Sequence, residues 1–138
     1  MKTTPLGRRS FCAGLLLLNL GLAGMVRAEE VPVVPISELM ADPQRFEGQR
    51  VRVVGYLRLQ FDRNALYMTR DDYNNSVAEH ALWLDLKNSQ LRSSSKLNNG
   101  HVTVEGVFGP ADKVHGGPWA GALKEVSSLR MWRKPRGN

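Results

Sequence analysis

Hydrophobic and polar residues alternate most clearly over residues 50–59, Arg-Val-Arg-Val-Val-Gly-Tyr-Leu-Arg-Leu. The period of two in its first half predicts a β-strand with one buried face and one face in water. Gly55 interrupts this alternation, and a glycine inside a strand is typical of a bulge or a bend. We therefore expect this strand to bend and to take part in two sheets.

Four later segments have strand-like patterns, at 65–69, 81–86, 101–108 and 123–132. In the third of these, Val102 and Val104 are expected to point inward, and Gly106 marks a second candidate bend. The segments between the strands are polar or rich in glycine. We predict a loop over 70–80, a loop with room for a short helical turn over 87–99, and a glycine-rich loop over 109–121.

Before the first strand, the sequence predicts an extended lead-in, one short helix and a turn. Two prolines in residues 29–35 indicate an extended lead-in. Residues 36–41 fit a short helix that Ser37 can cap and that Asp42-Pro43 ends, because the residue before a proline avoids the helical conformation. A turn at Glu47-Gly48 is expected to follow.

Five short strands, one short helix and two glycine bends indicate a single mainly β domain over residues 36–132. A small five-stranded OB-fold-like barrel with a short N-terminal helix has these elements. A small sandwich or an SH3-like barrel fits the same strand count and spacing. Residues 133–138 are predicted to be a basic tail.

The first 28 residues have the pattern of a cleavable signal peptide. Basic residues precede an apolar run over 11–25, and Val26-Arg27-Ala28 resembles a cleavage site, which predicts cleavage between Ala28 and Glu29. The apolar run is shorter than the roughly 20 residues that a membrane-spanning helix needs, so an uncleaved anchor is the weaker alternative. We expect a periplasmic or secreted protein that has no membrane anchor after cleavage.

The export route is open between two alternatives. Arg8-Arg9-Ser10-Phe11 resembles the twin-arginine motif, and Arg27 near the cleavage site favours that route. Gly7 departs from the usual residue before the arginine pair, and the leucine run is hydrophobic enough for general secretion.

The signal peptide also accounts for much of the composition. It holds the only cysteine, Cys12, so the exported part can have neither a disulfide nor a thiolate ligand or nucleophile. It also holds four basic residues and no acid, and so supplies four of the six net positive charges. Four further basic residues lie in the last nine positions, so the high isoelectric point is weak evidence for a nucleic-acid-binding fold.

Three segments carry a family resemblance. The first is the entry to the domain, which comprises Ile36-Ser37-Glu38-Leu39 and Val51-Arg52-Val53-Val54-Gly55-Tyr56-Leu57. The second is Val102-Thr103-Val104-Glu105-Gly106-Val107-Phe108, and the third is Gly121 to Leu129. Together they resemble the small exported OB-fold proteins of bacteria, whose activity is generally unassigned. The resemblance covers most of residues 36–132 and implies the fold. It does not imply a function, because relatives that bind nucleic acids share only the fold.

The sequence offers no constellation for catalysis or for a metal. The histidines, His80, His101 and His115, have no ligand-motif spacing, and Asp71-Asp72 lacks the order of an EF-hand loop. Ser93-Ser94-Ser95 is a polar loop with no nucleophile elbow, and Asp85 and Glu105 are predicted on the outer faces of strands. We therefore predict a protein that is not an enzyme and has no cofactor and no bound metal.

Aromatic and basic residues on the strands and the last loop suggest a ligand-binding face. In OB-folds the ligand lies across the middle strands and between the first and last hairpin loops. Aromatic side chains beside arginines can stack bases or sugars. The alternative is that Tyr67 and Trp119 plug the barrel ends and that the arginines are solvated. The candidate ligand-binding residues are Arg52, Tyr56, Arg58, Tyr67, Trp83, His115 and Trp119.

Two hypotheses about function follow. The first is a non-enzymatic periplasmic binding module whose ligand is a nucleic-acid strand, a glycan or another extended polymer. The second is a protein-interaction factor of the cell envelope, such as an inhibitor, an immunity partner or an assembly partner, which docks through a strand edge and the loop 113–121. The oligomeric state and the particular ligand do not follow from the sequence.

Overall fold

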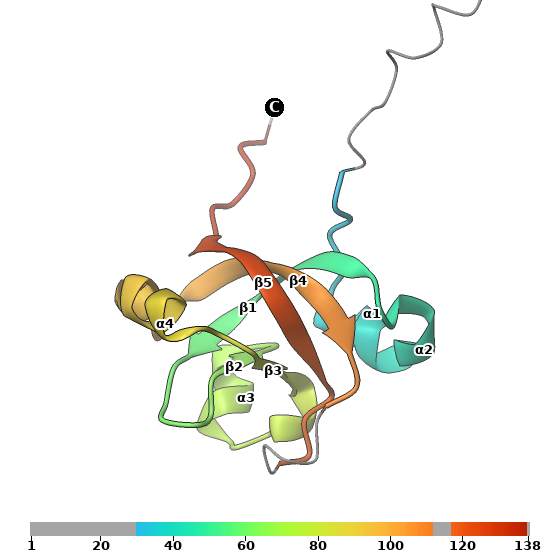
Figure 1. The fold of residues 1–138 in the computed structure, drawn as a ribbon, viewed down its shortest axis with the longest axis horizontal. Helices are drawn as coiled ribbons and strands as arrows, with labels where there is room; N and C mark the ends of the chain where they lie inside the picture. Colours follow the sequence, from blue (N-terminus) through green and yellow to red (C-terminus); the bar gives the residue numbers. More distant parts are fainter. Residues whose placement is uncertain (1–29, 112–116, 138) are drawn as a thin grey trace, which may run out of the picture. The chain divides into compact units, whose positions relative to one another are not determined.

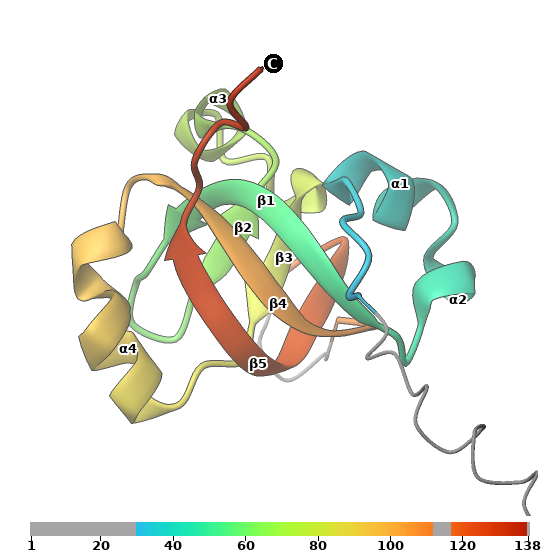
Figure 2. The same ribbon diagram turned by 90° about the horizontal axis from the view of Figure 1, so that it is seen from above.

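Five strands close into a barrel in the computed structural model, which describes residues 30–111 and 117–137. The order around the barrel is β1-β2-β3-β5-β4, with β4 returning to β1 (Figures 1 and 2). β3 and β5 are parallel, and the other neighbours are antiparallel. The strands are β1 (Arg50–Arg58), β2 (Ala65–Tyr67), β3 (Ala81–Leu84), β4 (His101–Gly109) and β5 (Gly121–Met131).

The predicted mainly β, OB-fold-like barrel is therefore confirmed. Closure excludes the two-sheet sandwich, because every strand has a neighbour on both sides. β2 and β3 are shorter than their predicted segments, and β5 begins two residues earlier. The signal-peptide prediction, including Ala28 and Glu29, and the prediction for His115 lie outside the described residues.

The core lies inside the barrel, and all five strands contribute apolar side chains to it, with a period of two that is clearest in β4. Val102 and Val104 point inward as predicted, while His101 and Thr103, which alternate with them, are more exposed. Burial of these apolar side chains is the main stabilising term for the fold. The fully buried side chains include Val51, Val53, Leu57, Leu66, Leu82, Leu84 and Leu123.

Two short helices, α1 (Ile36–Ala41) and α2 (Pro43–Phe46), lie on the opposite side of the barrel from α4 (Asn88–Ser94) (Figures 1 and 2). Leu39 and Phe46 join the barrel core. The predicted capping role of Ser37 is wrong, because Pro35 occupies the cap position and no side chain caps the helix. α2 was not predicted from the sequence; it begins at Pro43, and a proline at the first position is compatible with a helix start.

The lead-in before α1 is extended, as predicted, and it pairs with β1. Val33 forms a parallel bridge with Arg52. The Val34 amide donates to the Arg52 carbonyl and the Arg52 amide to the Pro32 carbonyl, both at 2.9 Å. The lead-in thus covers an edge of β1 that would otherwise be open.

Both glycine bends have identifiable causes. β1 pairs with β4 over 50–56 and with β2 over 56–58, so the strand has two neighbours within one closed barrel and not a place in two sheets. Gly55 itself carries no register shift, and its role is close packing, because a Cβ there would lie 2.6 Å from the Tyr67 carbonyl oxygen. At Gly106 the pairing with β5 shifts register, which confirms the second predicted bend.

The segment between β2 and β3 is helical, so the loop predicted over 70–80 is wrong. It contains α3 (Arg70–Asn74) and a 3-10 turn, η2 (Ala78–His80). The Thr69 hydroxyl caps α3 by accepting from the Asp72 amide at 3.0 Å. Thr69 and the two aspartates that follow it carried this helix-start signal in the sequence.

The segment between β3 and β4 contains α4 and a second 3-10 turn, η3 (Ser95–Leu97), in place of the single helical turn expected there. The Gln90 side-chain amide donates to the Val126 carbonyl at 2.7 Å and so fixes α4 beside β5. Within the described part of the chain, no helix is both long and apolar enough to span a membrane.

Candidate functional site

Four of the predicted binding residues share the outer face of β1, β2 and β3. Tyr56 pairs with Tyr67, Arg58 pairs with Ala65, and Ala65 pairs in turn with Trp83. Since paired residues point to the same side of a sheet, Tyr56, Arg58, Tyr67 and Trp83 lie on one face. The sequence prediction grouped these residues without knowing their register.

Aromatic rings cover this face in a continuous cluster, which we call the aromatic cluster: Tyr56, Tyr67, Tyr73 and Trp119. Tyr73, on α3, lies 5.9 Å from Tyr56 and 5.3 Å from Tyr67 between ring centroids. Trp119 meets Tyr67 edge-on at 6.4 Å. Tyr56 and Tyr67 are only 5% and 9% exposed, so their ring faces are packed against protein, as the plugging alternative expects for Tyr67.

Arg58 is held by the cluster. Its guanidinium lies 5.0 Å from the centroid of the Tyr73 ring, and it donates a 2.5 Å hydrogen bond to the Asn99 side chain. Its Nε is buried and has no hydrogen-bond partner among the described residues. These contacts give Arg58 a role in fixing Tyr73 over the sheet.

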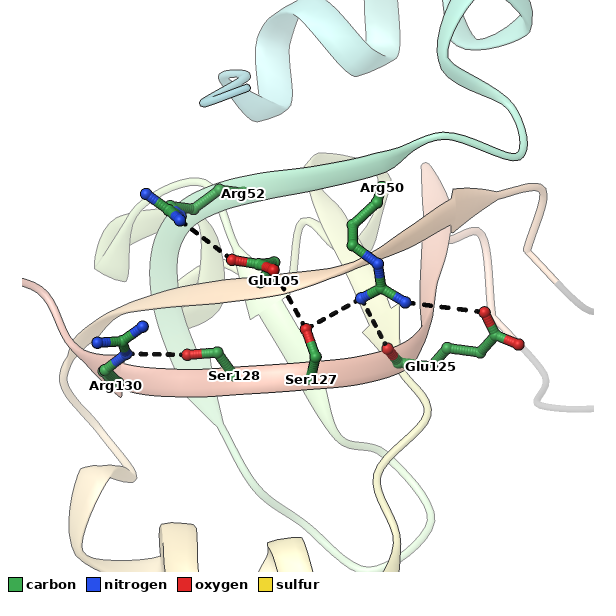
Figure 3. Close-up of polar contacts among 7 residues, drawn as sticks. All are labelled: Arg50, Arg52, Glu105, Glu125, Ser127, Ser128 and Arg130. Atoms are coloured by element: carbon green, nitrogen blue, oxygen red, sulfur yellow. Dashed lines mark hydrogen bonds and ion pairs between the residues drawn. The ribbon is translucent and has the colours of Figure 1, made fainter. Parts of the chain in front are cut away.

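Arg52 belongs to a different group of contacts on the barrel wall formed by β1, β4 and β5 (Figure 3). It pairs with Glu105 at 3.1 Å, and the Glu105 side chain is only 16% exposed. Ser127 donates to Glu105 at 3.3 Å and accepts from Arg50 at 3.0 Å. The structure therefore separates Arg52 from the aromatic cluster and ties it into a network that links three strands.

An open cleft of about 510 Å³ lies beside the aromatic cluster, and we call it the aromatic cleft. The β1–β2 loop contributes Arg63, whose exposed side chain forms no ion pair or hydrogen bond with another described residue. Polar groups from α3 and its following turn complete the walls. The lining residues are Gln60, Arg63, Tyr67, Tyr73, Asn74, Ser76, Ala78, Gly117, Pro118 and Trp119.

Sequence reasoning missed Arg63 and Tyr73. Tyr73 lies in the segment predicted as a polar loop, and the Thr69 cap would have indicated a helix that places its one aromatic residue on the sheet side. Arg63 had no such signal, because its position depends on the conformation of the β1–β2 loop.

A second and larger cleft, of about 750 Å³, opens where the β1–β2 loop, the end of β3 and α4 meet. We call it the barrel-mouth cleft. Trp83 lines it, which separates this residue from the other aromatic candidates. Gln60 lines both clefts, so the β1–β2 loop forms the ridge between them.

Two ionisable groups near the aromatic cluster have shifted pKa values. Burial, followed by the proximity of Tyr73, raises the pKa of Tyr67 above 10.0, and Arg63 and Arg58 oppose this shift. For Asp72, burial would raise the pKa, but hydrogen bonds with His80 and Thr69 outweigh it and hold the pKa below 3.8. Asp72 and His80 Nδ1 lie 3.1 Å apart and join α3 to η2.

The Asp72 shift predicts a contribution to stability that depends on pH. A carboxylate with a depressed pKa stabilises the fold above its unfolded pKa, and this contribution is lost as the pH falls through the lower folded value. The free energy of unfolding of the wild type is therefore expected to fall from pH 5 to pH 3, and we expect Asp72→Asn to make this fall smaller. Denaturant unfolding at the two pH values measures this difference, and an unchanged difference would count against the Asp72–His80 contact.

Among the described residues, no three His, Cys, Asp or Glu side chains lie close enough together to bind a metal ion. His80 contacts Asp72, and His101 lies 5.7 Å from Tyr56 between ring centroids.

Comparisons with known proteins give no family assignment. No family model matches the chain, and no curated protein does. Among solved structures, it is similar to a protein of Leishmania major Friedlin assigned as an aspartyl-tRNA synthetase. That match has 11% identity and a TM-score of 0.44, and it covers 79% of this chain and 22% of the other.

Proposed function

We propose that this chain is a non-enzymatic binding module of the periplasm that holds an extended polymer in the aromatic cleft. One observation carries the proposal: an exposed arginine, three aromatic side chains and several amide or hydroxyl groups converge on one open cleft. Few, well-placed polar groups among apolar and aromatic walls are typical of a binding site. The cleft lies between the first and last hairpin loops, where OB-folds bind oligosaccharides and oligonucleotides.

The charges in the cleft favour a glycan strand over a nucleic acid. Among the described residues that line the cleft, Arg63 is the single cationic one. Nucleic-acid binding draws most of its affinity from several lysines or arginines along a phosphate backbone. Sugar rings can stack on an aromatic ring and form hydrogen bonds with amides, and Trp119, Gln60 and Asn74 supply such groups here. Titration with chitin oligosaccharides and with oligothymidine, each at low and high salt, compares the two ligand classes.

Two substitutions test the site. Trp119→Ala and Arg63→Gln are each expected to weaken glycan binding about tenfold or more, because each removes a ligand contact from the cleft. Arg92→Gln is the matched control, since Arg92 is an exposed arginine on α4 that lies outside the cleft. Isothermal titration gives the affinities. Equal glycan affinity of the wild type and both cleft variants would show that the aromatic cleft is not the binding site.

The periplasmic location rests on the signal-like first 28 residues. Recovery of the protein in the cytoplasmic fraction after expression of the full chain would contradict it. A protein-interaction factor of the envelope is the second candidate function. The barrel-mouth cleft favours it, because Phe61 on its rim is 93% exposed.

A further inference from the structure

The barrel-mouth cleft is preformed. Asn98 fixes the start of the β1–β2 loop, because its side chain accepts from the Leu59 amide at 2.8 Å. At the other end of the loop, the Leu84 amide donates to the Asn64 carbonyl at 2.8 Å. The bond from Gln90 to β5 holds α4 as the third wall. A cleft with fixed walls loses little conformational entropy when it is filled.

The cleft has an apolar floor and an acidic rim. Leu59, Leu84, Leu86, Leu91 and the Trp83 ring contribute the apolar surface. Asp62 and Asp85 lie at the rim, are exposed, and form no ion pair with another described residue; Lys124 is the one cation there. Its volume of about 750 Å³ is large enough for an indole and neighbouring side chains. The cleft therefore suits a segment that combines a large apolar side chain with basic residues.

The chain itself carries such a segment from the last residue of β5 onward. Met131 and Trp132 are 61% and 39% exposed, which makes them two of the four large hydrophobic residues exposed in the described part of the chain. Arg133, Lys134 and Arg136 follow directly and form no ion pair with another residue that the structure describes. We call residues 131–137 the C-terminal segment. In both ribbon views it leads away from α4 (Figures 1 and 2), and none of its residues is among the described residues that line the cleft.

We propose that the barrel-mouth cleft of one molecule binds the C-terminal segment of a second copy, with Trp132 on the apolar floor and the basic residues against Asp62 and Asp85. The cleft and the segment are different surfaces of the same chain. Their contact is therefore heterologous: in a bound pair, one copy keeps a free segment and the other keeps a free cleft, so further copies can add at either end. Phe61 and Trp83 provide aromatic edges for the incoming indole.

Sedimentation velocity over a range of protein concentrations tests this association. Wild type is expected to self-associate, and Trp132→Ala and Asp85→Lys are each expected to raise the dissociation constant at least about tenfold. Val33→Ala is the matched control, because Val33 is also an exposed hydrophobic residue but lies outside the cleft and the segment. Circular dichroism at each concentration confirms that the variants are folded.

A mixing experiment tests the heterologous geometry. The Asp85→Lys variant keeps an intact segment and the Trp132→Ala variant keeps an intact cleft, so an equal mixture is expected to form a one-to-one dimer that neither variant forms alone. Four results would overturn the proposal. Two concern association: a wild-type protein that stays monomeric at high concentration, or association that survives Trp132→Ala. The other two are a mixture that stays monomeric and a Trp132 indole that is shielded from solvent at every protein concentration. The last result would place the segment in its own cleft.

Discussion

Replacement of Leu39 by alanine is expected to lower the free energy of unfolding by about 2–5 kcal/mol. Leu39 is fully buried, and it joins the N-terminal helix α1 to the barrel core. Alanine would leave a cavity between them that the closed barrel cannot fill by collapsing. Denaturant unfolding of the purified protein gives the value. A change below about 0.5 kcal/mol would mean that α1 is not part of the cooperative unit.

Ser37→Ala in the same helix is the control for Leu39. Ser37 is exposed, lies inside α1 and makes no capping bond, so its loss should change stability by less than about 0.5 kcal/mol. If Ser37 capped the helix, as the sequence alone suggests, the change would be about 1 kcal/mol. The pair therefore separates core packing from helix capping as the source of stability at this end of the barrel.

Replacement of Gly55 by alanine is expected to destabilise the barrel by about 3 kcal/mol, at the upper end of the usual cost of overpacking. A Cβ at this position would lie 2.6 Å from the Tyr67 carbonyl oxygen and 2.7 Å from the Leu66 Cγ. The carbonyl belongs to a paired strand and cannot move without breaking the β1–β2 ladder. The expected result is a lower unfolding midpoint with an unchanged denaturant slope.

Gly109→Ala is the matched substitution for Gly55. Gly109 also lies in a strand, but a Cβ there would meet no atom within 4 Å. Its replacement should change stability by less than about 0.5 kcal/mol. Similar losses for the two glycines would show that strand propensity, and not the close approach of β1 to β2, sets the cost.

The local patterns of the chain predicted most of the barrel. Alternating valines in β4 were enough to assign its inner face, and Gly106 marked a real register shift. The short helix at 36–41 followed from the proline that ends it. These features depend on residues close in sequence, so a single chain carries the information.

The state of the candidate site could not be predicted in the same way. Tyr56 and Tyr67 were expected to meet a ligand, but Tyr73 covers both, and its position depends on the packing of a helix that the polar composition of 70–80 concealed. Arg52 and Arg58 looked alike in the sequence. Strand register pairs Arg52 with Glu105 on β4, whereas the packing of helix α3 places Tyr73 against Arg58.

The three tryptophans of the chain give the most direct test of the central claim, which is that the ligand occupies the aromatic cleft. Trp119 lines that cleft, Trp83 lines the barrel-mouth cleft, and Trp132 belongs to the exposed C-terminal segment. Their indole NMR signals should be followed while chitin oligosaccharide is added at a constant, low protein concentration. We predict that the Trp119 signal shifts with saturation while the Trp132 signal stays in place. A saturable shift of the Trp83 signal with an unmoved Trp119 signal would contradict the account.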